Sequence, residues 1–214
     1  MKGKKLFYFV LFFSLIAVLY GCSGRNSRAY LEDRIGNQIS RVYPTKNLED
    51  LFEQFPSGFT IFQAHTEGEY RIKVELIGDP ITRMIEGTIK KVRRKNGEVT
   101  SQVEVKYQNE EFSFSDEKLA TELWGYKKFL FQEMKIDKDV MSRLKLKDKS
   151  YNPKNGSFEI YYAIQNSGLN QFFELDESEV LDISFHGSNS NVGYYYTVAV
   201  RNKTGLEFKE RVYE

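Results

Sequence analysis

The chain has 214 residues, and its 31 Lys and Arg are nearly balanced by 30 Asp and Glu. That balance argues against a general nucleic-acid-binding protein, which would show a strongly basic domain. The length is enough for one domain with a sizeable core or for two small ones. Cys22 is the only cysteine, so no internal disulfide can form and burial of side chains must stabilise the fold.

The segment 1–21 is typical of a cleaved export signal. Its three lysines precede an apolar run over 6–19, and such positive charge holds the start of a signal at the cytoplasmic face. The run is shorter than the roughly 20 residues that a resident helix needs to cross the hydrocarbon core. We therefore expect this signal peptide to be removed.

Cys22 is the predicted lipid attachment site. Leu19 and Gly21 occupy the −3 and −1 positions before it, where a lipoprotein signal peptidase reads the chain, although Tyr20 between them is bulkier than is usual. We expect N-palmitoyl and S-diacylglycerol groups on Cys22, and more than one acyl chain is needed for stable anchoring. The alternatives are an uncleaved anchor and an exported protein with a free thiol.

The segment 22–29 is short and polar, and we expect a lipidated flexible tether that keeps the following domain near the membrane. Apolar residues then recur at every fourth position over 30–41, which predicts a helix. Pro44 ends it, and Asn47 is predicted to cap a second helix that ends before 56–58.

From Phe59 the apolar period changes to two, which predicts strands of an antiparallel sheet with one wet face. The first run of strands comprises 59–63, 69–76, 84–92 and 99–107, and 110–115 is expected to extend the last strand. The second run comprises 158–164, 180–185, 194–200 and 206–212. A hairpin joins the third and fourth strands through 95–98. The two runs predict either two related sheets or one long curved sheet.

Between the two runs of strands the pattern is helical. Apolar side chains follow helical spacing over 116–134, and shorter helices are predicted over 137–144 and 169–175. Because helices and strands are segregated, with helices at the N-terminus and in the middle of the chain, we predict an α+β fold with antiparallel sheet. We expect a single domain over 30–214, which could contain two related halves, 30–115 and 116–214.

No pattern in the sequence is typical of a catalytic or metal site. His65 and His186 are the only histidines, and they show neither zinc-site spacing nor an evident catalytic partner. The pattern Ser-x-x-Lys occurs twice, beginning at Ser115 and Ser142, and the first is better explained as a helix cap. We therefore expect no enzymatic activity, no cofactor and no metal.

The densest charge cluster lies at the predicted hairpin tip and comprises Lys90, Lys91, Arg93, Arg94 and Lys95. Strand alternation places Lys91, Arg93 and Lys95 on one face. One interpretation is a solvated hairpin end whose lysines protect a sheet edge. The other is a contact of the last four residues with anionic lipid headgroups, wall polymers or an acidic host surface, where each basic residue near a membrane contributes about 1 kcal/mol.

Three successive tyrosines, Tyr194, Tyr195 and Tyr196, form the other conspicuous cluster. In a strand the first and third face one way and Tyr195 faces the other. Core packing is one interpretation, and an exposed platform of rings for a ligand or partner is the alternative.

The segment 42–51 (VYPTKNLEDL) resembles the tandem-type lipoproteins, the conserved staphylococcal antigen family. Further segments agree with that family in the same order: 86–89, 116–131, 150–153 and 187–194. Together with Cys22, the resemblance spans essentially the whole chain. It is weakest over 55–81, where the acidic, glycine-rich stretch usual in the family is not evident.

The resemblance implies a cell-envelope lipoprotein without known catalytic residues, active in immune recognition through its lipidated N-terminus and, for some members, in host-cell contact. We therefore expect an outward-facing, membrane-anchored surface protein with a binding role, whose partners are the membrane and a host-surface or immune-receptor protein, with no nucleic acid. The alternative is an extracytoplasmic binding protein for a small molecule or a cell-wall polymer. A small-molecule site should be a concave, mostly apolar pocket, whereas a partner-binding surface should be a flat aromatic or charged patch.

Overall fold

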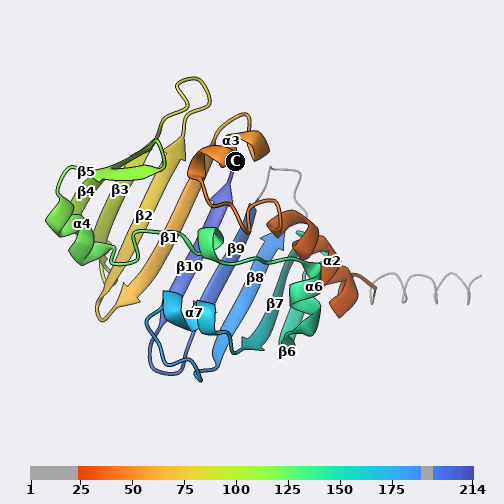
Figure 1. Ribbon diagram of the computed structural model, residues 1–214. Coiled ribbons are helices and arrows are strands. Elements are labelled where there is room, and N and C mark those ends of the chain that lie inside the picture. The colour runs from red at the N-terminus through yellow and green to blue at the C-terminus, as the bar shows by residue number, and fades with distance from the viewer. Residues whose placement is uncertain (1–23, 189–194) are drawn as a thin grey trace, which may run out of the picture.

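The protein is seen in a computed structural model that describes residues 24–188 and 195–214 (Figure 1). The predictions for Leu19, Gly21, Cys22 and Tyr194 lie outside these residues. Within the described residues, ten strands form one antiparallel sheet in the order β5-β4-β3-β2-β1-β10-β9-β8-β7-β6. The fold is thus mostly antiparallel sheet with added helices.

The elements have the following bounds. The strands are β1 Phe59–Glu67, β2 Tyr70–Gly78, β3 Ile85–Arg93, β4 Val99–Gln108, β5 Glu111–Phe114, β6 Lys145–Tyr151, β7 Ser157–Ile164, β8 Leu181–Ser188, β9 Tyr195–Arg201 and β10 Glu207–Tyr213. The helices are α2 Arg28–Ile39, η1 Leu48–Asp50, α3 Leu51–Gln54, α4 Glu117–Leu123, α5 Leu130–Glu133, α6 Lys138–Arg143 and α7 Ser167–Phe172. None of these helices is long and apolar enough to cross a membrane.

One continuous sheet, and not two, joins the two runs of strands. The first run forms successive hairpins from β1 to β5, and the second does so from β6 to β10. The runs meet where β1 pairs antiparallel with β10, with Ile61 opposite Val212 and Gln63 opposite Glu210. Ile61 and Val212 are both buried, so the pairing of the first strand with the last makes the core continuous.

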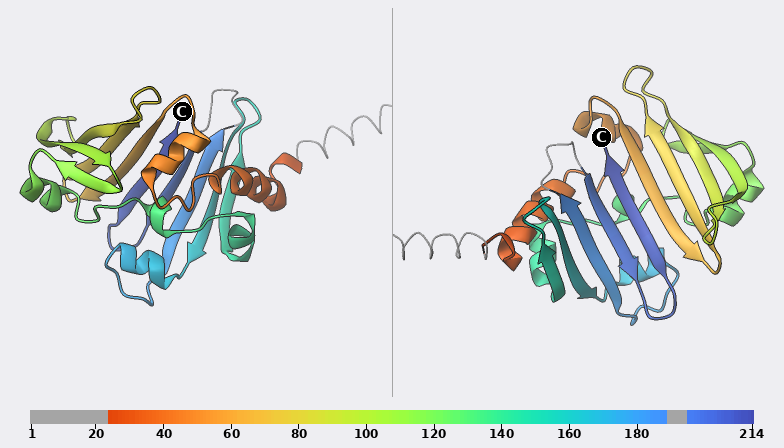
Figure 2. Two further views of the ribbon diagram at one scale, coloured as in Figure 1. Left: turned by 45° about the horizontal axis from the view of Figure 1, so that its top comes forward. Right: turned by 180° about the vertical axis from the view of Figure 1, so that it is seen from behind.

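All the helices lie over one face of the sheet. In the view of Figure 1 they and the connection from α4 to α6 stand in front of the strands, and in the reverse view of Figure 2 the strands stand in front. The burial of alternate residues agrees, as in β7, where Phe158, Ile160 and Tyr162 are buried and the residues between them are not. We call these two sides the covered face and the bare face. The wet face that the alternation predicted is the bare face.

The helix predicted over 116–134 is broken in the structure. Asp116 caps α4 by accepting a hydrogen bond from the Leu119 amide at 2.9 Å, and α4 ends before Trp124. The chain is then extended across the covered face until α5, and Trp124 and Phe129 are fully buried there. The helix predicted from the spacing was wrong because an extended segment that crosses beneath a broad sheet can bury apolar side chains on every side. The helix cap proposed at Ser115 was also wrong by one residue, since Asp116 is the cap.

Both edge strands differ from the prediction. The segment 110–115 does not extend β4, because Asn109 and Glu110 take left-handed conformations, with φ of 52° and 64°, and reverse the chain into β5. Strand β6 was missed altogether. Its sequence KLKDKSY is mostly polar and exposed, as befits an edge strand whose charges discourage pairing with other chains.

The N-terminal helix α2 begins at Arg28, within the segment predicted as tether. The Arg28 guanidinium donates to the carbonyl oxygens of Met141, Ser142 and Leu144 at 2.7 to 3.2 Å, which ties α2 to the end of α6. A Cβ atom at Gly36 would lie 2.5 Å from the backbone nitrogen of Lys138. This glycine therefore allows α2 and α6 to approach closely.

Candidate functional site

The basic hairpin joins β3 to β4, and part of its charge is engaged within the molecule. Lys91 Nζ lies 4.8 Å and the Arg93 guanidinium 5.8 Å from the centre of the Tyr70 ring. Arg93 also pairs with Glu98 at 2.8 Å. Lys91 and Arg93 thus share a face, as the alternation predicted.

Arg94 points toward the centre of the sheet. Its Nη2 atom lies 3.8 Å from a carboxylate oxygen of Glu207, and its Nη1 atom donates to the Gly68 carbonyl at 3.4 Å. Strand β3 lies between β2 and β4. The lysines of β3 therefore lie on an inner strand and do not themselves form a sheet edge, since β5 and the part of β4 that β5 does not pair form the edge on this side. The other part of that interpretation, a solvated hairpin end, agrees with the exposure of Arg94 and Lys95.

His65 is a packed residue of the covered face. Its side chain is 9% exposed, its ring meets the edge of the Tyr126 ring at 5.3 Å, and its Nε2 atom lies 3.1 Å from Glu67. Burial lowers the pKa of His65 despite the nearby carboxylate. The neutral form is therefore favoured, and this histidine has a structural explanation.

His186 does have partners, contrary to the expectation from sequence. On the bare face, its Nε2 atom lies 2.9 Å from the Ser184 hydroxyl and its Nδ1 atom 3.1 Å from Glu159. The Tyr161 hydroxyl donates to the other Glu159 oxygen at 2.6 Å, and this hydrogen bond is the main cause of the lowered pKa of Glu159. Ser184 and His186 are two residues apart in β8, and Glu159 lies opposite His186 in β7.

This serine–histidine–glutamate arrangement lacks the other parts of a nucleophilic site. Ser184 lies in the middle of β8, opposite Tyr161 on one side and Ala199 on the other. The backbone amides around it belong to the sheet ladder, whereas acyl transfer needs free donors aimed at the developing oxyanion. The cluster is better explained as a hydrogen-bonded network that orders the bare face.

Two adjoining hollows form a groove across the centre of the bare face. One has a volume of about 290 Å³ and the other about 370 Å³, and both are lined by Phe62, Arg71 and Lys209. Arg94, Arg201 and Glu207 add to the first hollow. His186, Tyr195, Thr197 and Arg211 add to the second. We call the combined hollows the bare-face groove.

Arg211 is the central side chain of this groove. Its guanidinium lies 4.9 Å from the ring centre of Phe62, 5.2 Å from that of Tyr195 and 4.8 Å from that of Tyr213. It donates to the Tyr195 hydroxyl at 2.5 Å. Its Nε atom is buried and has no hydrogen-bond partner among the described residues.

The two described residues of the tyrosine cluster match different interpretations. Tyr196 is 7% exposed and packs against Phe158 on the covered face, with ring centres 6.1 Å apart. Tyr195 is 43% exposed on the bare face. Tyr195 therefore belongs to an exposed ring cluster and Tyr196 to the core. Sequence reasoning missed Phe62 and Arg211 as members of that cluster because they come from β1 and β10.

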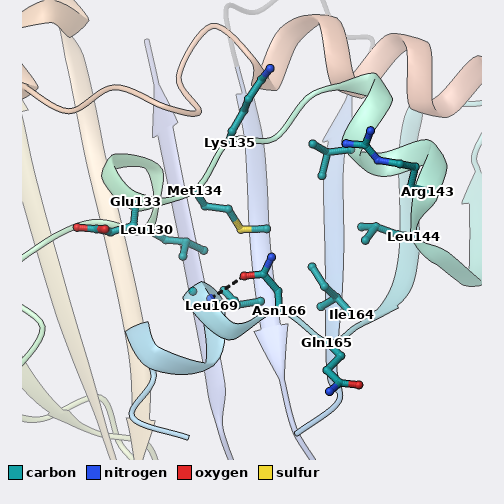
Figure 3. A pocket seen from close by; sticks show the side chains of 12 residues that line it. Leu130, Glu133, Met134, Lys135, Arg143, Leu144, Ile164, Gln165, Asn166 and Leu169 are labelled. Carbon is teal, nitrogen blue, oxygen red and sulfur yellow. Dashed lines mark hydrogen bonds between the residues drawn. The ribbon is translucent and has the colours of Figure 1, made fainter. Parts of the chain in front are cut away.

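A third hollow, of about 410 Å³, lies on the covered side between α5, α6, α7 and the end of β7. Figure 3 shows apolar side chains that include Leu144, Ile164 and Met134, with Lys135 and Arg143 on its upper side. The oxygen of Asn166 is already engaged, since it accepts the Leu169 amide at 2.9 Å to cap α7. This hollow is concave and partly apolar, as a small-molecule site should be.

Glu210 is completely buried under the covered face and accepts four hydrogen bonds. Its Oε1 atom accepts from the Tyr43 hydroxyl at 2.8 Å and the Phe131 amide at 2.9 Å. Its Oε2 atom accepts from the Gln63 side-chain amide at 2.9 Å and the Leu130 amide at 2.7 Å. The carboxylate thus connects β10 to β1, to the segment before η1 and to the first turn of α5.

The environment of Glu210 favours a structural role. Burial raises its pKa to about 7, because the charged form loses its hydration, and the four donors offset only part of that loss. The Trp124 indole nitrogen extends the network by donating to Gln63 Oε1 at 2.6 Å. A carboxylate with no exposed surface cannot meet a substrate. Across the described chain, no three His, Cys, Asp or Glu side chains gather closely enough to hold a metal ion.

Comparison with known proteins finds a relative that is described as a lipoprotein. No family model matches this chain. An uncharacterized lipoprotein of Staphylococcus epidermidis (strain ATCC 12228 / FDA PCI 1200) is 24% identical over an alignment of 244 positions that covers 94% of each chain. Among solved structures, LprF from Mycobacterium bovis matches 77% of this chain and 89% of its own, at 9% identity and a TM-score of 0.36, a score too low to indicate a shared fold. The chain is thus similar along nearly its whole length to a staphylococcal protein described as a lipoprotein.

Proposed function

We propose that this protein is a lipoprotein, anchored to the outer side of the cell membrane through lipid on Cys22, with a non-catalytic binding role. The charged and apolar parts of segment 1–21 and the single cysteine support the export and the anchor. The similarity to a staphylococcal lipoprotein over 94% of both chains supports the same assignment. The tandem-type lipoprotein family is the finer assignment that the motifs in 42–51 favour.

The observation that carries the binding role is the bare-face groove. Its residues come from strands of both halves of the chain, and its arginine cluster with Phe62 and Tyr195 is partly exposed to solvent. Arginine and aromatic side chains are enriched where proteins bind their partners. The Ser184–His186–Glu159 network borders this groove without oxyanion donors, which favours binding over catalysis.

The lipidated end supplies a second role in this proposal. Acyl chains on Cys22 would be the moiety that stimulates innate immunity, and the domain would contact host surfaces. The alternative is binding of a small molecule or a cell-wall polymer, and a small molecule would use the hollow between α5, α6 and α7, where the Asn166 side-chain oxygen is already engaged. The groove differs from that hollow in its surplus of positive charge, so we assign the binding role to the bare face.

Replacement of Cys22 by alanine tests the anchor. The Cys22→Ala protein should incorporate no labelled fatty acid and should accumulate as a precursor that retains 1–21, because the sulfur that carries the lipid is gone. Labelling with a fatty-acid analogue and intact-mass measurement would follow this, with Ser23→Ala as the matched control. Normal processing and membrane localisation of the Cys22→Ala protein would contradict the proposal.

A further inference from the structure

The bare-face groove carries more positive charge than its own carboxylate balances. Five basic side chains line it, and Glu207 is the single acidic side chain among its described lining residues. Arg94 reaches Glu207 at 3.8 Å. Of the other four, Lys209 lies near enough to Glu159 to help lower the pKa of that carboxyl, and Arg71, Arg201 and Arg211 form no ion pair with a carboxylate in the described part of the chain. Such a groove attracts an anion with several charges.

The chemistry of Arg211 favours a phosphate-type anion. Its guanidinium is held between the rings of Phe62, Tyr195 and Tyr213 at 4.8 to 5.2 Å. A planar guanidinium held in this way loses little freedom when it donates two parallel hydrogen bonds to a phosphate group. In a ligand whose phosphates are joined by carbon atoms, those carbon atoms would find an apolar surface on the exposed ring of Tyr195.

The extent of the groove favours a chain over a small ion. The four cations come from β2, β10 and β9, and with β1 between them these strands, spaced about 4.8 Å apart, span about 14 Å. A single phosphate would meet the cations at only one point along this length. A linear polymer with regularly repeated charges would meet them in succession.

The position of the groove disfavours a peptide or a bilayer. Its strands lie inside the sheet, where each pairs with a neighbour on both sides, so no strand edge is open for a peptide to add a strand. Arg211 has a buried Nε atom, whereas Arg71, Arg201 and Lys209 are exposed around the hollows. A narrow chain can reach both Arg211 and the exposed cations around it, whereas a planar bilayer surface would meet mainly the exposed ones.

We propose that the bare-face groove binds a linear phosphodiester polymer of the cell envelope, with Arg71, Arg201, Lys209 and Arg211 holding the phosphates. This inference rests on the binding role proposed for the groove, and it assigns the groove to an envelope polymer in place of a host surface. The proposed lipid anchor and short tether would keep the groove close to the outer side of the membrane, where its partner must also lie.

Binding of labelled poly(glycerol phosphate) to the purified full-length chain tests this inference. Arg71→Gln/Lys209→Gln/Arg211→Gln should weaken binding at least about tenfold and reduce the slope of log affinity against log salt by about 2, as each lost phosphate contact contributes about 0.7 to that slope. The control Lys118→Gln/Lys154→Gln/Lys203→Gln removes equal charge from exposed sites elsewhere and should change affinity less than about twofold. Arg71→Gln/Lys209→Gln, which alters only exposed side chains, gives a second test if loss of Arg211 disturbs folding.

Three outcomes would overturn the inference. The first is that the groove variants and wild type bind with equal affinity, and the second is that the control variant loses as much affinity as they do. The third is that the protein binds polyglutamate or phosphatidylglycerol vesicles in preference to the phosphodiester polymer. The Cys22→Ala protein should keep the full affinity for the polymer. Failure to bind while lipid is still attached to Cys22 would therefore refute the partner and leave the anchor intact.

Discussion

Glu210 and Arg211 are neighbours in β10, and their side chains lie in opposite environments. Glu210 points into the covered face and has no exposed surface, while Arg211 lies among the rings of the bare face. Glu210 is withdrawn from water and Arg211 is half-buried, and each is stabilised by different means. Hydrogen-bond donors surround the carboxylate, and aromatic faces surround the guanidinium.

The Glu210→Gln variant should change the pH dependence of stability. In wild type the pKa of Glu210 is raised from 4.5 to about 7, so its contribution to the free energy of unfolding is fully present below about pH 4.5 and is lost as the pH rises through 7. His65, whose pKa is lowered, acts in the opposite direction and is the same in both proteins. Urea unfolding from pH 4 to 8 should show a free energy of unfolding that falls through pH 7 in the wild type, and the variant should lack this fall.

The same variant should also be less stable at low pH. The glutamine NH₂ group would face an amide or side-chain NH that can only donate, and an orphaned buried donor costs about 1 to 3 kcal/mol. Glu53→Gln, which changes an exposed carboxylate, is the matched control. An unchanged pH profile in Glu210→Gln would show that the carboxylate is not the titrating group.

At the scale of elements, the alternation of the sequence predicted most of the strands. The central strands were recognised because each buries alternate side chains on the covered face, as β7 does. Strand β6 was missed because an edge strand buries little, and the 116–134 helix was wrong because α4 stops at Trp124, which is buried beneath the sheet. Helical spacing is a sign of one buried stripe, and residues in an extended segment under a sheet can imitate it.

The pairing of β2 with β3 depends on Gly87. A Cβ atom there would lie 1.9 Å from the carbonyl oxygen of Glu75, so Gly87→Ala must force the two strands apart. Alanine normally stabilises a strand relative to glycine, but here we expect a loss of at least about 3 kcal/mol, comparable to a severe overpacking. Urea unfolding would measure it, with Gly125→Ala, where a Cβ atom meets nothing within 4 Å, as the control. Equal stability of Gly87→Ala and wild type would contradict the close approach of β2 and β3 at Gly87.

At the scale of the whole molecule, β10 lies between β1 and β9 although it is the last strand. The ten-stranded sheet is therefore complete only when the last strand of the chain has paired with the first. Contacts so distant in sequence make folding slow and the two halves interdependent. Such a topology favours one cooperative unit over two separate halves.

Unfolding should accordingly occur in one transition. The fluorescence of Trp124, the single tryptophan, reports the environment of β1 and α4, and far-UV circular dichroism reports the whole sheet. The two signals should share one midpoint in urea, and Gly87→Ala should shift both together. Two separate transitions would instead indicate that 30–115 and 116–214 unfold independently.

The sequence by itself determined features that depend on nearby residues: the alternation of the central strands, the hairpin between β3 and β4 and the cap at Asn47, while the export signal with its cysteine stays a prediction. Each arises from local periodicity or from one side chain and its neighbours. Only the tertiary structure decided that the two runs of strands form one sheet, that one face stays bare, and that Phe62, Arg71, Tyr195 and Arg211 meet in one groove. The pairing of β1 with β10 brings these residues together, and the burial that drives this pairing is summed over the whole core, so no local pattern records it.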